Sequence, residues 1–209
     1  GIISAPQPEA VEAGALAFKA GGNAIDAAIA CALVQTAVDP QMCGIAGFGS
    51  MHLYLAERNQ HLLLDFHGRA PKAVTPDMWD GLIEHEAEDG FGFILKGRVN
   101  EVGYGSITTP MSLRAYDEAL KRFGTKDIAE LLAPAIDYCE NGFMVRPHVA
   151  YFWNVHEGAG RVSQIEKFRC TDGGRKIYFK DDGELRKPGE ILRNPDMAET
   201  YRRIAANGV

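Results

Sequence analysis

A short polar segment that follows an apolar stretch carries the residues of this sequence best suited to chemistry. It reads Asp65-Phe66-His67-Gly68-Arg69 and comes at the end of a predicted β-strand. An arginine held there can bind a carboxylate through two parallel N–H donors. The alternative is that Arg69 pairs with a neighbouring acid such as Asp65 and has a purely structural role. The residues alone leave both interpretations open.

Other patterns of catalytic and ligand-binding residues are missing from the sequence. No GxSxG pentad holds a serine nucleophile, although Ser50 follows Gly49. No HExxH motif occurs, and His85, between Glu84 and Glu86, is interpreted as part of a solvated acidic loop. We therefore expect neither a metal ion nor a cofactor.

Three glycines, Gly44, Gly47 and Gly49, have the spacing GxxGxG, which differs from the GxGxxG of nucleotide-binding loops. They also lie between a predicted helix and a predicted strand, in the reverse of the order that such a loop needs. Glycine suits tight turns and close chain packing because it has no Cβ. We interpret the three glycines in that way.

Two helices near the start of the chain are predicted to support this region. The first covers residues 8–20 and ends at Gly21-Gly22. Its predicted buried face consists of Val11, Ala15 and Phe18. Asn23 is expected to cap the second helix, which runs from residue 24 to about 37. This second helix is apolar on nearly every side, which is typical of a helix buried between layers.

The elements that follow are predicted from periodicity and from turn residues. Two strands, at residues 50–56 and 61–66, should form a hairpin. The others are expected to be a short helix with a loop at 77–89, a helix at 110–123, helices at 128–132 and 134–141, a strand and turn at 176–183, and a helix at 195–207. This order predicts a layered α/β or α+β fold, with residues 1–209 as a single domain.

The composition is that of an ordinary globular protein, with 46% hydrophobic and 24% charged residues. The net charge of −6 argues against a nucleic-acid partner, since proteins that bind nucleic acids usually carry a basic surface. The apolar stretch at residues 27–38 is well short of the roughly 20 residues that a membrane helix needs. We therefore predict no membrane span.

The four cysteines are interpreted as free thiols because they show no CxxC spacing. They are Cys31, Cys43, Cys139 and Cys170. Free thiols favour a reducing compartment, and no secretion signal is visible at the N-terminus. We expect a cytoplasmic protein, while a periplasmic or secreted one stays possible if a signal has been removed.

Three separated blocks resemble the gamma-glutamyltranspeptidase family of N-terminal nucleophile hydrolases. They are residues 21–28 (GGNAIDAA), residues 132–143 (LAPAI, then ENGF) and residues 194–205 (NPDMA, then YRRIA). The blocks occur in the family's order, and the resemblance covers essentially the whole chain. It identifies residues 1–209 as the N-terminal portion of a gamma-glutamyltranspeptidase-like large subunit.

The resemblance implies an αββα sandwich whose two central sheets take strands from two subunits. Members of the family are made as precursors that cut themselves, which frees a threonine at the start of a small subunit. That threonine is the nucleophile, and its own amino group is the base. The reaction it implies moves a γ-glutamyl group from an amide such as glutathione to water or to an amino acid.

No catalytic residue is expected in this chain. Thr108 and Thr109 precede Pro110 at a predicted helix start, where the family has no cleavage point. We expect the small subunit, or the remainder of the same precursor, to supply the threonine. The 209-residue chain alone is therefore predicted to be inactive.

The resemblance also suggests the substrate-binding residues, with one departure. The family motif is usually DFRETAP, and its arginine binds the substrate's α-carboxylate. His67 stands at that position here, and an arginine follows two residues later as Arg69. Either Arg69 takes over as the carboxylate-binding residue, or the pocket has lost its preference for γ-glutamyl groups. His67 either hydrogen-bonds an acyl oxygen or has a structural role. Two alternatives are a hydrolase of another small amide, such as an oxamate amidohydrolase or an acylase, and a scaffold that retains the fold without activity.

Overall fold

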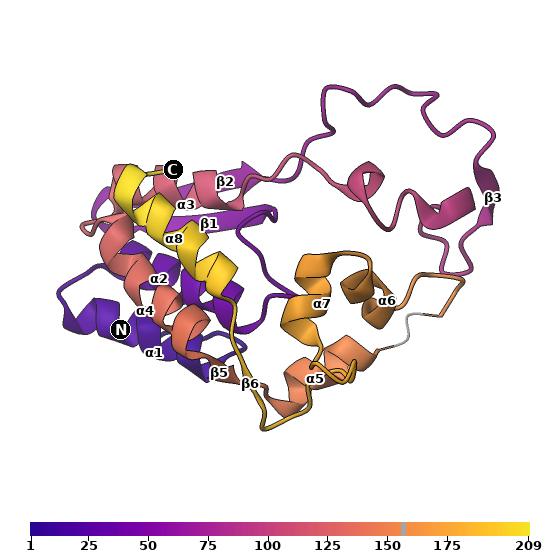
Figure 1. The fold of residues 1–209 in the computed structure, drawn as a ribbon. Coiled ribbons are helices and arrows are strands. Elements are labelled where there is room, and N and C mark those ends of the chain that lie inside the picture. The colour runs from indigo at the N-terminus through magenta and orange to yellow at the C-terminus, as the bar shows by residue number, and fades with distance from the viewer. Residues whose placement is uncertain (156–157) are drawn as a thin grey trace. The chain divides into compact units, whose positions relative to one another are not determined.

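The computed structural model describes residues 1–155 and 158–209, and Figure 1 shows its mixture of helices and strands. The α-helices are α1 (Pro8–Lys19), α2 (Ala24–Val38), α3 (Ser112–Phe123), α4 (Ile128–Asn141), α5 (Pro147–Asn154), α6 (Gln164–Arg169), α7 (Asp172–Tyr178) and α8 (Pro195–Asn207). The strands and 3-10 turns are β1 (Gly49–Leu55), η1 (Ala56–Arg58), β2 (Gln60–Phe66), β3 (Ile83–Glu86), β4 (Phe93–Leu95), η2 (Lys96–Arg98), η3 (Tyr104–Ser106), β5 (Phe143–Met144) and β6 (Ile191–Leu192). The strands pair two by two: β1 with β2, β3 with β4, and β5 with β6. The predicted α/β or α+β class is confirmed.

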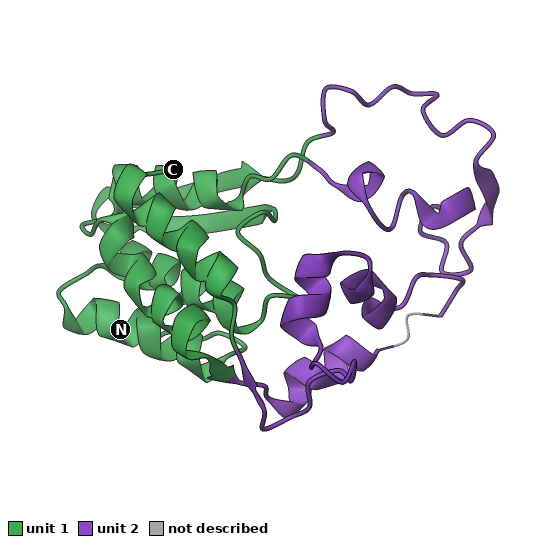
Figure 2. Ribbon diagram, in the orientation of Figure 1, with its two compact units in different colours: residues 1–69, 109–143, 193–209 green, residues 70–108, 144–192 purple. Residues whose placement is uncertain are grey.

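The chain divides into two compact units, coloured separately in Figure 2. Unit 1 consists of residues 1–69, 109–143 and 193–209, and unit 2 of residues 70–108 and 144–192. Each unit therefore draws on segments far apart in the sequence. The expectation that residues 1–209 form a single domain stays a prediction.

The core of unit 1 forms around α2, which contacts α1, α3 and α4. Ile29, Leu33 and Val34 of this helix have no exposed surface. Helix α8 packs on α4, as Figure 1 also shows. The prediction of a buried, nearly uncharged second helix is confirmed, and its burial on several sides explains why its sequence has no polar face.

The face of α1 that contacts the core differs from the predicted one. Its buried residues are Ala10, Ala13, Gly14 and Ala17, whereas the predicted set, Val11, Ala15 and Phe18, is only partly buried. A Cβ on Gly14 would lie 2.9 Å from the carbonyl oxygen of Ala27 in α2. Small residues thus allow the two helices to approach closely, and the larger apolar side chains lie beside that contact.

The predicted hairpin is confirmed as an antiparallel pair of β1 and β2. Its register runs from Gly49 opposite Phe66 to Leu55 opposite Gln60. The connection through η1 ends at Asn59, which adopts a left-handed conformation with φ of 44°. On the side that faces α3, the ring of Phe66 meets that of Tyr116 edge-on, with centroids 6.3 Å apart. This packing fixes the strand end that carries the predicted site.

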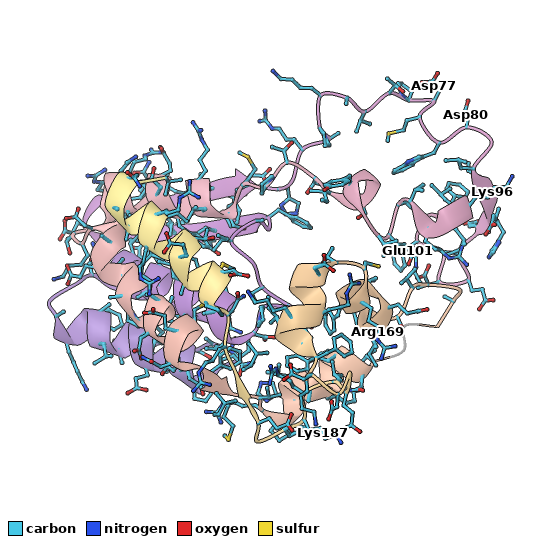
Figure 3. The ribbon with its side chains drawn as sticks, viewed as in Figure 1. Asp77, Asp80, Lys96, Glu101, Arg169 and Lys187 are labelled. Carbon is cyan, nitrogen blue, oxygen red and sulfur yellow. The ribbon has the colours of Figure 1, made fainter. Side chains whose placement is uncertain are left out.

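Two predictions in unit 2 are wrong. Residues 77–82 form turns instead of a helix, and the chain then enters strand β3. Asp77 and Asp80 project away from this stretch in Figure 3. The pairing of β3 with β4, in which Ile94 and Leu95 are buried, outweighs the weak local preference for a helix. Residues 172–178 form helix α7 instead of a strand, and only the following turn at Gly183 is as predicted.

Helix α4 of unit 1 also differs from the prediction, because it continues through Pro134 where two helices were expected. Proline removes one backbone donor and usually breaks a helix. Here the apolar residues on both sides of it, Leu131, Leu132, Ala135 and Cys139, are all buried. Their burial keeps the two halves in one helix.

Helices α5, α6 and α7 of unit 2 share an aromatic cluster. Trp153 has no exposed surface and meets Phe168 and Tyr178 edge-on, with ring centroids 6.2 and 5.2 Å away. The rings of Phe168 and Tyr178 stack at 3.8 Å.

Among all the described residues, no helix combines the length and the apolar character that crossing a membrane requires.

Candidate functional site

The start of α2, where the sequence reads GGNAIDAA, is a structural clamp. Oδ1 of Asn23 accepts from the N–H groups of Ile25 and Asp26, and Oδ2 of Asp26 accepts from the N–H of Asn23. Asp26 also accepts from Thr125 N–H (2.8 Å), Thr125 Oγ1 (2.7 Å) and Lys126 N–H (3.0 Å). Burial opposes the charged carboxylate, but the hydrogen bonds from Thr125, Asn23 and Lys126 outweigh it and lower the pKa of Asp26. The segment holds α2 to the α3–α4 connection.

The glycine segment between α2 and β1 forms a tight turn, as predicted. The N–H of Gly47 donates to the carbonyl of Gly44 at 3.1 Å, and the carbonyl of Gly47 accepts from the N–H groups of Met111 and Ser112. A Cβ on Gly47 would lie 3.0 Å from the Gly44 carbonyl oxygen. The segment thus joins the start of α3 to the start of β1.

A cavity of about 370 Å³ in unit 1 adjoins this turn. Its polar lining residues are Gln35, Thr36, Cys43, Ser112 and Tyr116. Burial, reinforced by the nearby Asp39 carboxylate, raises the pKa of the Cys43 thiol. A thiol with a raised pKa stays protonated at neutral pH and is a poor nucleophile. This cavity offers hydrogen-bonding groups and no activated nucleophile.

His67 lies directly after β2 and is held through one ring nitrogen. Its Nδ1 lies 3.0 Å from the carbonyl oxygen of Gly49 and 3.4 Å from Oδ1 of Asp65, which also accepts from the backbone N–H of His67 at 3.1 Å. A carbonyl oxygen only accepts hydrogen bonds, so Nδ1 carries a hydrogen and donates it. Nε2 is then left for another partner, on a side chain that is 67% exposed. The ring also lies against Phe48, with centroids 5.7 Å apart.

Arg69 is exposed and is held by its backbone. Its carbonyl accepts from the N–H of Thr109 at 2.9 Å, in an isolated antiparallel bridge. Within residues 1–155 and 158–209, its guanidinium has no hydrogen-bond or ion-pair partner. The structural pairing with Asp65 is thus not formed among these residues, and Asp65 contacts His67 instead.

The segment after β2 therefore presents the cation of Arg69 and the imidazole of His67, and the ring of Phe48, just before β1, lies against that imidazole. These groups can bind and orient an anionic or polar ligand, but they do not include an activated nucleophile. Sequence reasoning missed the contacts of Asp65 and Gly49 with His67, because the Gly49 contact depends on the register of β1 with β2. The described part of the chain also holds no group of three or more His, Cys, Asp or Glu residues that could bind a metal.

The same fold occurs in solved enzymes. The chain superposes with a TM-score of 0.83 on gamma-glutamyltranspeptidase from Helicobacter pylori, at 28% identity, covering 100% of this chain and 54% of that one. It also superposes on cephalosporin acylase from Bacillus halodurans, with a TM-score of 0.76, at 31% identity, over 97% of this chain and 35% of that one. The fold is that of the N-terminal nucleophile hydrolases, as expected.

Sequence comparison narrows this class to one family. The family described as Gamma-glutamyltranspeptidase matches residues 10–209, and the chain belongs to it. Relatives include the acylase ACY 1 proenzyme of Pseudomonas sp. strain SE83, at 35% identity, and the glutathione hydrolase proenzyme of Bacillus subtilis strain 168, at 31%. Each is matched along 100% of this chain, which spans 35% and 32% of their respective lengths. The chain thus corresponds to about a third of such a proenzyme.

Proposed function

We propose that this chain is the front part of the large subunit of an amide hydrolase or acyltransferase that matures by cutting itself. The observation that carries the proposal is the family match across residues 10–209. Relatives named as proenzymes, three times as long, support a further part of the precursor that supplies the threonine nucleophile. The reaction is transfer of a γ-glutamyl or related acyl group from an amide such as glutathione to water or to an amino acid.

Arg69 is the proposed residue that binds the carboxylate of the substrate. Its guanidinium is exposed at the end of β2 and has no partner among the described residues. Its backbone is fixed by the bridge to Thr109, so the side chain starts from a defined position. His67, with Nδ1 bound to Gly49, offers Nε2 to a polar group of the acyl chain. The two side chains together would orient the acyl group.

The test of this assignment is hydrolysis of γ-glutamyl-p-nitroanilide by the complete protein. Arg69→Ala should lower kcat/KM about 10- to 150-fold, the range that loss of a charged hydrogen bond of about 1.5–3 kcal/mol implies. Arg69→Lys should recover part of this loss, because lysine keeps the charge but not the two-pronged geometry. Arg58→Ala, in the exposed turn of the same hairpin, is the control and should act like wild type. An unchanged kcat/KM in Arg69→Ala would remove Arg69 from the site.

The second candidate function is that of an acylase or another small-amide hydrolase. Two observations favour it: the acylase ACY 1 proenzyme is 35% identical to this chain, against 31% for the Bacillus glutathione hydrolase, and His67 stands where an arginine is usual. Parallel assays with γ-glutamyl-p-nitroanilide, a glutaryl amide, which keeps the carboxylate but lacks the α-amino group, and oxamate distinguish the two. Faster turnover of the glutaryl amide or of oxamate would identify the second function.

We also propose that residues 1–209 alone have no catalytic activity. Turnover of a γ-glutamyl anilide by the purified 209-residue chain would contradict it. If the complete protein has no processed threonine and hydrolyses none of these amides, the chain belongs to a scaffold that retains only the fold. Intact-mass measurement of the complete protein shows whether the precursor is cut.

We also propose a cytoplasmic location, since Cys31, Cys43, Cys139 and Cys170 are all free thiols in the structure. A periplasmic or secreted location is the alternative. Fractionation of the producing cells, followed by immunodetection, separates the two.

A further inference from the structure

Two histidines on the β1–β2 hairpin have ring nitrogens that lie close to each other. Tyr54 lies opposite His61 in the register, and His52 lies opposite Leu63, so the two histidines are diagonal neighbours across the strand pair. His52 Nε2 lies 3.1 Å from His61 Nδ1, with ring centroids 5.2 Å apart and planes inclined by 19°. Both residues are exposed.

This separation matches two nitrogens bound to one metal ion. Zinc–nitrogen bonds of about 2.0–2.1 Å place two ligands about 3.3 Å apart in a tetrahedron and about 2.9 Å apart at a right angle. The observed 3.1 Å lies between these values. Imidazole is a preferred ligand of Zn²⁺, Cu²⁺ and Ni²⁺. The contact is also a hydrogen bond between the rings, so one nitrogen carries a hydrogen and the other a lone pair.

We propose that His52 and His61 form a two-histidine site for a divalent transition metal ion such as Zn²⁺. The donor ring first moves its shared hydrogen to its other ring nitrogen through solvent. Both facing nitrogens then present lone pairs, the metal takes the place of the shared hydrogen, and no proton is lost overall. Solvent completes the coordination, because no set of three ligand side chains occurs among the described residues.

The surrounding residues orient the pair without competing for the metal. The ring of Tyr54 stacks on that of His61, with centroids 4.7 Å apart, and its hydroxyl donates to Oδ1 of Asn59 at 3.2 Å. Tyr54 therefore limits the rotation of His61. The metal would join β1 to β2 and stabilise the hairpin by binding only its folded form.

This site does not depend on the proposed function. Because a strand rises about 3.3 Å per residue, His61 lies roughly 20 Å along the chain from His67. The metal would thus lie outside the region that binds the acyl group. Zinc binding and amide hydrolysis can be measured separately, and neither result decides the other.

The test is zinc titration by calorimetry with the complete protein in a buffer that does not bind metals. Wild type should bind one more equivalent of Zn²⁺ than His52→Ala or His61→Ala, or bind it at least about tenfold more tightly. His85→Ala, which removes an exposed histidine of unit 2, should match wild type. Equal stoichiometry and affinity in all four proteins would overturn the site.

A second measurement uses wild type only and so does not depend on how the variants fold. Histidines are modified with diethyl pyrocarbonate with and without Zn²⁺, and the modified positions are mapped by mass spectrometry. Zinc should slow modification of both His52 and His61 severalfold and leave His85 unchanged. Equal modification of the pair in both conditions would contradict the proposal.

Discussion

The amino end of α2 and the carboxyl end of β2 both gather polar side chains in unit 1, but they differ in how many partners those side chains have. At α2, the buried Asp26 accepts hydrogen bonds from Asn23, Thr125 and Lys126. At β2, the guanidinium of Arg69 has no partner in the described chain. One region is closed by its own chain, and the other is open to a ligand.

The two regions show that a recognisable motif need not be a functional site. The GGNAIDAA segment is the most characteristic stretch of the sequence, yet its polar groups are used by the fold. The segment around Arg69 departs from the usual motif of the family, yet its cation is available. Polar groups whose hydrogen bonds are made within the chain indicate a structural role. An exposed charged group without a partner indicates a candidate site. If the contrast holds, changes in the two regions should differ in their effect on the free energy of unfolding.

The largest loss of stability is expected from Asp26→Ala. It leaves the N–H groups of Asn23, Thr125 and Lys126 without their acceptor, and we expect about 3 kcal/mol of destabilisation. Urea unfolding of the 209-residue chain, followed by circular dichroism, measures it. Glu12→Ala, at an exposed position of α1, is the control and should stay within about 0.5 kcal/mol of wild type. Equal stability of the two variants would mean that the clamp does not hold the fold.

Thr125→Val should cost about 1 kcal/mol, because it removes one hydroxyl donor to Asp26 and leaves the backbone donors in place. The same unfolding measurement applies. A loss as large as that of Asp26→Ala would show that the hydroxyl, and not the backbone, carries the clamp.

Lowering the pH should reduce the free energy of unfolding of the wild type by less than these two substitutions do. The pKa of Asp26 is lowered in the folded chain, so its contribution to stability is complete above the unfolded carboxyl value of about 3.9. That contribution is lost as the pH falls through the folded pKa. Unfolding measured between neutral pH and strong acid should therefore show a steeper decline for wild type than for Asp26→Asn. Parallel curves would contradict the lowered pKa.

The smallest effect on stability is expected from Arg69→Ala, which should stay within about 0.5 kcal/mol of wild type. Its effect should instead fall on the kcat/KM of the complete protein. A marked loss of stability would place Arg69 with Asp26 as a structural residue, and the comparison between the two regions would fail.

Local signals in the sequence were sufficient for much of the fold. Gly21-Gly22 and Asn23 marked the boundary between α1 and α2, and alternating apolar residues marked the hairpin. The buried face of α1 was not predictable in the same way, because small residues such as Gly14 gain their role only from the approach of α2. Pro134 predicted a break, but burial of the residues around it keeps α4 continuous.

The candidate site was predictable in residue type and less so in arrangement. His67 and Arg69 were predicted as site residues because they follow a predicted strand. His67 stands at the position of the family's arginine, and Arg69 carries a positive charge. The Nδ1 contact with Gly49 depends on strand register, and the bridge from Arg69 to Thr109 joins residues far apart in the chain. Long-range pairings of this kind have no local signature. The hydrogen bonds of Asp26 were not predictable in the same way, because its partners Thr125 and Lys126 lie about a hundred residues away.

That separation has a consequence for the order in which the chain acquires its structure. Closing a loop of this size costs entropy that local contacts do not incur, so contacts across it form slowly. On the ribosome, α2 and its capping box can form as soon as residues 23–38 emerge, but Asp26 gains its bonds from Thr125 and Lys126 only after Lys126 has left the exit tunnel. During refolding, the amides of Thr125 and Lys126 should gain protection from hydrogen exchange later than the N–H of Asn23 and the middle of α2.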